Sequence, residues 1–212
     1  MQRRYLSVVS ALLVSLVLGC SKGDQASTAA TRSPGAPTSV SPALSSVDWK
    51  NAAVHAELCG GRGTVRLADG VGFTHSTKWP PSWIVEINLW GSVMFGDIDG
   101  DGAPEAVVAL GCNNGGGTAD GQLGFGLEVF TGTVADMTLL GTITPEPPAG
   151  PWHSSYMDTS ETQISQGSIT VEEVFYGAAD GTCCPSGRRK SVWTHDNGTL
   201  VQESSVVIVE PE

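Results

Sequence analysis

A dense run of carboxylates lies between positions 95 and 105, in the segment Phe-Gly-Asp-Ile-Asp-Gly-Asp-Gly-Ala-Pro-Glu. Four acidic residues occupy positions 1, 3, 5 and 9 of this loop: Asp97, Asp99, Asp101 and Glu105. Calcium takes about six to eight oxygen ligands, and a short loop supplies them only by turning sharply, as glycine permits. Gly102 stands at position 6. We therefore expect the four carboxylates and the carbonyl of Ala103 to bind Ca²⁺.

The same segment also allows a metal-free interpretation, as an acidic hairpin that packs Val107 and Leu110 into the core. In that case the carboxylates repel one another, and a pair 4 Å apart costs roughly 1–4 kcal/mol at dielectric constants of about 80 to 20. An EF-hand is disfavoured, because position 12 is Val108, where that loop needs a bidentate Glu.

The first twenty residues have the parts of a bacterial export signal. Arg3 and Arg4 supply positive charge, and Tyr5–Leu18 is an uncharged, mostly apolar run of 14 residues. A membrane-spanning helix needs about 20 such residues. The closing Val-Leu-Gly-Cys resembles the lipobox of bacterial lipoproteins, which implies cleavage before Cys20 and a lipid on its sulfur. A plain secretory signal and an uncleaved anchor are the alternatives.

The chain divides into three segments of different composition: a signal peptide at 1–19, a lipidated tether at 20–46 and a β-rich extracytoplasmic domain at 47–212. The tether is mostly Ser, Thr, Ala, Pro and Gly, which cannot bury enough apolar surface to offset the entropy of ordering. We therefore expect it to be disordered. The composition changes at Val47-Asp48-Trp49, where the first aromatic residue after the signal appears.

Removal of the signal makes the chain more acidic. The sequence has 11 basic and 22 acidic residues; the signal holds two of the basic ones, which leaves nine against 22 and a net charge of −13. Such a charge argues against nucleic acid as a partner and against electrostatic adhesion to anionic lipid. We expect attachment to the extracytoplasmic face of the cell membrane through the lipid alone.

Apolar and polar residues alternate along the domain with the two-residue period of half-buried strands, as in Val-Glu-Ile-Asn-Leu at 85–89. Asp-Gly and Asn-Gly pairs, which supply the positive φ of tight hairpins, separate the runs. The predicted strands are 63–67, 71–75, 83–89, 92–95, 105–111, 122–130, 136–143, 168–176, 189–195 and 199–209. The pattern predicts a mainly β, antiparallel fold, either a sandwich or an open barrel, with a long irregular excursion over 144–156.

Four cysteines remain in the domain besides the lipidated one: Cys59, Cys112, Cys183 and Cys184. Four cysteines in an exported domain imply two disulfides. Adjacent Cα atoms lie about 3.8 Å apart, below the usual range of about 4.4–6.8 Å, so a bridge between Cys183 and Cys184 is disfavoured. We expect Cys59 and Cys112 each to pair with one of those two neighbours, in either arrangement. A zinc site is disfavoured because no CxxC spacing occurs.

The acidic segment resembles the calcium loops of integrin-type FG-GAP repeats, written D-x-D-x-D-G-x-x-D, including the preceding Phe-Gly and the following strand 106–110. It departs from them in having Glu at position 9 and in occurring once, which disfavours a full propeller.

The order of features also resembles a group of actinobacterial lipoproteins, the LppP/LprE type. The matching pieces are the lipobox, Val-Asp-Trp at 47–49, the Gly-Asp-x-Asp-Gly-Asp-Gly loop, Cys-Asn-Asn-Gly-Gly-Gly at 112–117, and Thr-Cys-Cys-Pro-Ser-Gly at 182–187 followed by Trp193. This resemblance implies a surface lipoprotein and brings no established reaction.

We expect a non-enzymatic binding or structural role, directed to a cell-wall component or an envelope protein. No nucleophile motif such as Gly-x-Ser-x-Gly occurs. The alternative is an extracytoplasmic hydrolase with a metal or carboxylate site at 97–105. A catalytic metal site keeps an open position, whereas a structural one is closed by its ligands.

Overall fold

The computed structural model describes residues 43–79, 84–114, 121–145, 154–165, 167–181 and 183–209. The regular elements in these ranges are antiparallel strands and three single-turn 3-10 helices, which confirms the mainly β prediction. The helices are η1 (Leu44–Ser46), η2 (Trp49–Asn51) and η3 (Glu57–Cys59). None of the helices in these ranges has the length and apolar character that crossing a membrane requires.

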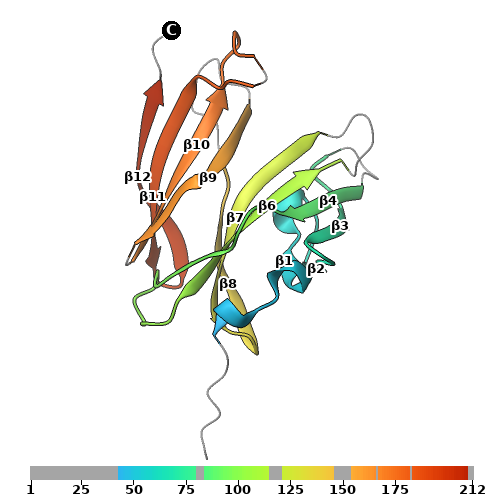
Figure 1. Cartoon of the computed structure of the whole chain (residues 1–212), viewed down its shortest axis with the longest axis vertical. Coiled ribbons are helices and arrows are strands. Elements are labelled where there is room, and N and C mark those ends of the chain that lie inside the picture. Colours follow the sequence, from blue (N-terminus) through green and yellow to red (C-terminus); the bar gives the residue numbers. More distant parts are fainter. Residues whose placement is uncertain are drawn as a thin grey trace, which may run out of the picture. The chain divides into compact units, whose positions relative to one another are not determined.

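The strands are β1 (Ala53–His55), β2 (Thr64–Arg66), β3 (Val71–His75), β4 (Ile84–Leu89), β5 (Met94–Gly96), β6 (Glu105–Asn113), β7 (Gln122–Thr133), β8 (Asp136–Ile143), β9 (Ser154–Ser165), β10 (Ser168–Tyr176), β11 (Gly187–Asp196) and β12 (Thr199–Val209). One sheet has the order β3-β4-β6-β7-β8, with β5 paired to the first residues of β6. A second has the order β12-β11-β10-β9, and β1 pairs with β2. Figure 1 shows the second sheet in orange and red.

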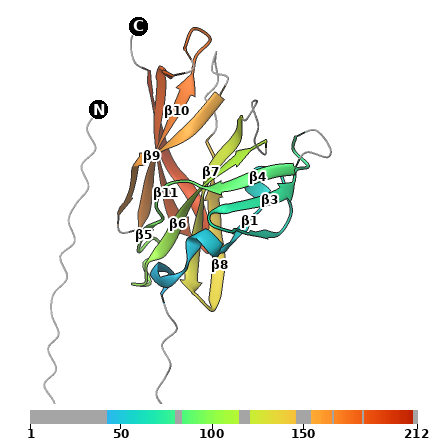
Figure 2. The same ribbon diagram turned by 45° about the vertical axis from the view of Figure 1, so that its right-hand side comes forward.

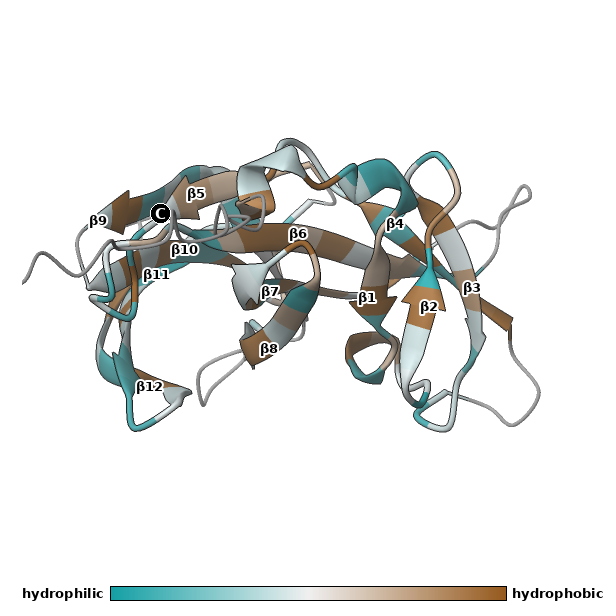
Figure 3. Cartoon of the chain, turned by 90° about the horizontal axis from the view of Figure 1, so that it is seen from below, coloured by the Kyte–Doolittle hydropathy of each residue, from teal (hydrophilic) through white to brown (hydrophobic). Residues whose placement is uncertain are grey.

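Strand β6 lies between two hydrophobic clusters, and every residue from Glu105 to Cys112 is buried. Successive side chains of a strand point to opposite faces. The even-numbered residues 106–112 pack against the segment from η1 to η3, whereas Val107 and Ala109 pack with residues of β7 and β10. The second cluster therefore joins the two main sheets face to face. In Figure 3 much of β6 is brown, the colour of hydrophobic residues.

The N-terminal part of the domain covers the even-numbered face of β6, and Figure 2 shows it in blue beside that strand. Leu44 is fully buried, although it lies within the segment predicted to be tether. Ala43 forms a β-bridge with Thr133 of β7. Trp49 packs on Phe130 with ring centroids 5.4 Å apart. Leu44 therefore belongs to the core, and the ordered domain includes residues 43–46.

Among the described residues, the predicted strands agree with the structure except at two elements; Asp120 and most of the predicted excursion over 144–156 lie outside the described residues. Asn197-Gly198 joins β11 to β12 with φ angles of 49° and 84°, as a tight turn requires. The sequence missed β1, which is three residues long, and β9, whose start falls in the predicted irregular excursion over 144–156. The first residues of β9, Ser-Ser-Tyr-Met, show no apolar alternation, and this strand is held by its pairing with β10.

The predicted disulfide pairing is wrong. Cys59 of η3 is bonded to Cys112 of β6 with a Cα–Cα distance of 5.5 Å, and Cys183 is bonded to Cys184. Cys112 belongs to the even-numbered face of β6, and η3 packs on that same face. Cys183 and Cys184 lie instead between β10 and β11. The packing of η3 on β6 brings Cys59 and Cys112 together, and the spacing of the cysteines in the sequence does not encode this packing.

We predict that non-reducing peptide mapping will recover a peptide linked through Cys59 and Cys112. The bridge spans 53 residues, and closing a loop of that length contributes about 4 kcal/mol in the chain-entropy model. The double variant Cys59→Ala/Cys112→Ala should lose about that much unfolding free energy in urea titrations. A link from either residue to the 183–184 pair would contradict this arrangement.

Candidate metal centre

The acidic loop connects β5 to β6, and the pairing of these strands positions its first and last carboxylates. Gly96 at the end of β5 is paired with Glu105 at the start of β6. Asp97 follows immediately, so the chain leaves and re-enters the sheet at adjacent points. Ile98 is almost fully buried in the cluster between the two sheets and holds the loop against the core.

Three carboxylates of the loop converge. One oxygen from each of Asp97, Asp99 and Glu105 lies within 4.8 Å of the others, a grouping that could hold a metal ion. Asp97 and Asp99 are half-buried, whereas Glu105 is almost completely buried. Thr131 of β7 donates its hydroxyl to Glu105 at 3.1 Å and, at a longer 3.4 Å, to Asp99. The cluster is therefore built on three strands, β5, β6 and β7.

Backbone N–H groups of the loop are bound by the same carboxylates. Glu105 Oε2 accepts hydrogen bonds from the N–H of Ile98 at 2.7 Å and of Asp99 at 3.2 Å. Asp97 Oδ1 accepts from Gly100, and Asp99 Oδ1 from Asp101. A carboxylate has two oxygens with about four lone-pair sites. Each of these side chains can therefore hold the loop and still present oxygen to a cation.

Two glycines give the loop its sharp turn. Gly100 and Gly102 have φ angles of 82° and 88°, in the region that side chains other than glycine rarely adopt. No atom lies near enough to crowd a Cβ at either position. The requirement for glycine here is thus one of backbone conformation, as predicted for Gly102.

Not all of the predicted ligands join the cluster. Asp101 is exposed, lies outside the group formed by Asp97, Asp99 and Glu105, and accepts a hydrogen bond from the N–H of Ala103 at 2.7 Å. Its role is to close a local turn in this structure. Ligation by the carbonyl of Ala103 stays a prediction. Glu at position 9, where the FG-GAP pattern has Asp, is long enough to reach back to the loop's backbone.

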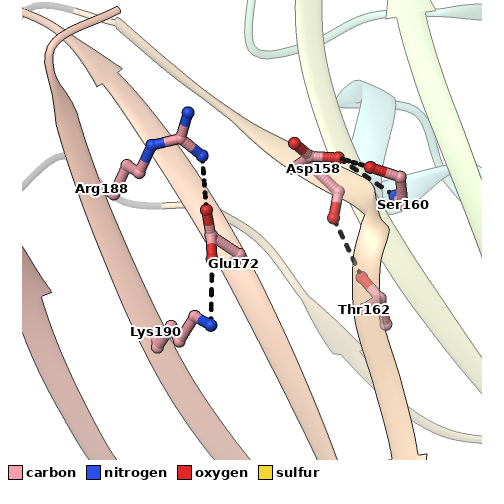
Figure 4. Close-up of polar contacts among 6 residues, drawn as sticks. All are labelled: Asp158, Ser160, Thr162, Glu172, Arg188 and Lys190. Atoms are coloured by element: carbon pink, nitrogen blue, oxygen red, sulfur yellow. Dashed lines mark hydrogen bonds and ion pairs between the residues drawn. The ribbon is translucent and has the colours of Figure 1, made fainter.

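A second polar cluster lies on the sheet of β9–β12, and the sequence analysis did not identify it. Glu172 of β10 is bound by Arg188 at 2.6 Å and by Lys190 at 3.4 Å, both from β11 (Figure 4). Glu172 is paired in register with Asp158 of β9, so two like charges stand opposite each other. The two cations offset that repulsion. Opposite charges at facing positions stabilise a sheet, which gives this cluster a structural role.

Asp158 closes an irregularity in β9. Between the register pairs Thr170–Gln163 and Glu172–Asp158, β9 advances five residues while β10 advances two. Asp158 accepts hydrogen bonds from the N–H and hydroxyl of Ser160, and its carbonyl accepts from the hydroxyl of Thr162 (Figure 4). These contacts satisfy polar groups that the ladder leaves unpaired at a bulge.

No protein-family model, no curated protein and no solved structure matches this chain. The resemblances to FG-GAP loops and to LppP/LprE-type lipoproteins therefore stay predictions from the sequence.

Glu128 of β7 is a buried carboxyl group away from the acidic loop. Its side chain is fully buried, and its Oε2 accepts a hydrogen bond from the backbone N–H of His55 at 3.0 Å. Its Oε1 makes no hydrogen bond within the part of the chain that the structure describes. Burial disfavours the charged form and raises the pKa of Glu128 to about 7, although the hydrogen bond from His55 acts in the opposite direction.

We predict that Glu128 makes the fold less stable as the pH rises from about 4.5 to 7. Because its folded-state pKa is raised, the folded protein binds the proton more tightly than the unfolded chain. The stabilisation is therefore fully present below about pH 4.5 and is lost as the pH passes 7, a change of about 3 kcal/mol.

Glu128→Gln provides the comparison, since an amide is neutral at every pH in this range and can still accept the His55 N–H. The unfolding free energy of the wild type minus that of the variant should fall by about 3 kcal/mol between pH 4.5 and 7.5. Taking the difference removes the pH dependence of all other groups. Parallel curves for the two proteins would refute the prediction.

Proposed function

We propose that the protein is a lipoprotein anchored to the extracytoplasmic face of a bacterial cell membrane, where its β domain has a non-enzymatic binding or structural role. The observation that best supports this location is the Cys59–Cys112 disulfide in the core. Disulfides persist in oxidising, exported compartments and are rare in the cytosol. Both cysteines are fully buried, so the bridge is an integral part of the packing.

The N-terminal sequence supports anchoring through a lipid. The charged start, the short apolar run and the closing Val-Leu-Gly-Cys are the parts of a lipoprotein signal that ends at Cys20. Two or more acyl chains give durable attachment, whereas one gives marginal binding. With Leu44 in the core, residues 21–42 would form the tether, and a flexible chain of that length would have a root-mean-square reach of roughly 23–28 Å, which suffices to lift the domain clear of the headgroups.

We predict that Cys20→Ala will prevent lipid attachment, because the thioether needs the sulfur. Wild-type protein should partition into the detergent phase and give a mass that includes acyl chains, whereas the variant should be released or remain unprocessed. Cys20→Ala protein that still carries lipid would exclude Cys20 as the site of attachment.

We further propose that the ion held by Asp97, Asp99 and Glu105 is calcium. All three offer hard carboxylate oxygens, and Ca²⁺ accepts irregular, flexible sets of such ligands, whereas Mg²⁺ demands a tighter octahedron. A cation here would also offset the mutual repulsion of the three charges.

A structural role for this ion is better supported than a catalytic one. Glu105 is enclosed and holds backbone N–H groups, so it is not accessible to a substrate. The carbonyl of Asp97 accepts a hydrogen bond at 2.9 Å from Gly167, in the turn between β9 and β10. Ordering the loop would therefore also support its contact with the second sheet.

We predict that millimolar calcium will raise the melting temperature of chelator-treated protein. A cation that binds only the folded state at a hundredfold excess over Kd stabilises it by about 2.7 kcal/mol, or roughly 5–10 °C for a domain of this size. Asp97→Asn should abolish the rise, because it removes the charge but keeps an oxygen for the Gly100 N–H. Gly102→Val should abolish it by preventing the turn.

Asp136→Asn is the matched control, since Asp136 is an exposed aspartate at the start of β8, outside the acidic loop. This variant should respond to calcium as the wild type does. Magnesium at the same concentration should have a smaller effect. Identical melting curves with chelator and with calcium would leave the loop as a metal-free acidic hairpin.

A further inference from the structure

A pocket of about 220 Å³ opens where β4, β6 and β7 meet, at the opposite end of β6 from the acidic loop. It is lined in part by Asn88, Trp90, Gly111, Asn113 and Gln122. Pockets for drug-sized ligands measure about 300–1,000 Å³. This one is smaller and suits a single ring-sized group.

The register of the sheet explains why the pocket lies here. Asn88 is paired with Gly111, and Asn113 is paired with both Glu86 and Gln122. On the same face of β6, Val107 and Ala109 are covered by the second sheet. Gly111 has no side chain to fill this space; a Cβ there would lie 3.6 Å from the ring of Trp90, at ordinary contact distance.

Trp90 provides a fixed aromatic wall. Half of its surface is exposed, yet its backbone N–H donates to the carbonyl of Ala109 at 2.8 Å. Its ring stands edge-on to Phe125, with centroids 5.8 Å apart and an interplanar angle of 84°. An exposed indole held in this way loses little freedom when a ligand packs against it.

The polar part of the described lining is neutral and consists of amides. Asn88, Asn113 and Gln122 each carry donors and an acceptor, and none of the described residues that line this pocket is charged. Asn113 is held by a hydrogen bond to Glu86 at 3.3 Å. Within the described residues, neither the amide of Asn88 nor the indole N–H of Trp90 makes a hydrogen bond. A ligand rich in hydroxyls, each both donor and acceptor, satisfies such a lining.

We propose that this pocket binds one neutral pyranose ring of a glycan, with the ring's C–H face on Trp90 and its hydroxyls on the amides of Asn88, Asn113 and Gln122. This assignment deepens the proposed envelope function and rests on it for the source of the ligand, a cell-wall polysaccharide. A nucleobase also stacks on indole. The net charge of −11, however, opposes the phosphates of a nucleic acid.

The test is calorimetric titration of the full-length protein, purified in a detergent without a sugar headgroup. The probes are the trisaccharide of N-acetylglucosamine, cellotriose as a plain hexose, and adenosine. At least one trisaccharide should bind with a Kd of roughly 0.1–1 mM, as expected for one small ring. Trp90→Ala should weaken that binding at least tenfold.

Two further variants separate the pocket from the fold. Gly111→Ala should weaken binding several-fold, because its methyl group enters the pocket at ordinary contact distance from Trp90 and needs no rearrangement. Phe95→Ala, which removes an exposed aromatic ring on β5, should bind as the wild type does. Melting curves of all variants check that each is folded.

Several results would overturn the proposal: no trisaccharide binding, binding that Trp90→Ala leaves unchanged, or binding of adenosine alone. Mass spectrometry of the same preparation records the lipid on Cys20. Lipidated protein that binds no sugar refutes the pocket and leaves the anchoring proposal intact. Sugar binding by protein without lipid refutes the anchoring and leaves the pocket.

Discussion

The burial of β6 on both faces is the constraint on which the other features depend. Eight successive residues, from Glu105 to Cys112, must be enclosed, so one face needs the N-terminal segment and the other needs the second sheet. Both clusters contain residues of β6, and β7 and β8 also contribute residues to each. The acidic loop ends at its first residue, and the Cys59–Cys112 bridge and the pocket lie near its other end. The position of β6 therefore determines where the acidic loop and the pocket lie.

Three buried glutamates illustrate different ways of keeping a carboxyl group inside a β domain. Glu105 accepts two backbone N–H bonds and a hydroxyl, so its charge is locally compensated. Glu173, also buried, is paired with Arg189 from the neighbouring strand. Glu128 has a single N–H partner, and burial raises its pKa to about 7. The three carboxyl groups are similarly buried and differ in the donors that surround them.

Local patterns predicted most of the strands, because alternation and Asn-Gly turns act over a few residues. The acidic loop was recognisable for the same reason: its spacing encodes a turn, and Asp97, Asp99 and Glu105 do converge. Asp101 was indistinguishable from them in sequence, since only the three-dimensional path shows that it closes a local turn outside the cluster. The disulfide pairing, β9, Glu128 and the pocket depend on contacts between distant segments. No spacing in the sequence specified them.

The covalent link between η3 and β6 has a mechanical consequence for an anchored domain. If the chain is held at Cys20, a pull on the domain enters at Leu44 and first peels the segment that contains η1 and η2 from β6. Peeling stops at Cys59, because a covalent bond ties that residue to the central strand. Extension beyond that point has to dislodge β6 itself, which both clusters resist. In a chain anchored at Cys20, the bridge would therefore limit the length of chain released under tension and keep the load off the acidic loop.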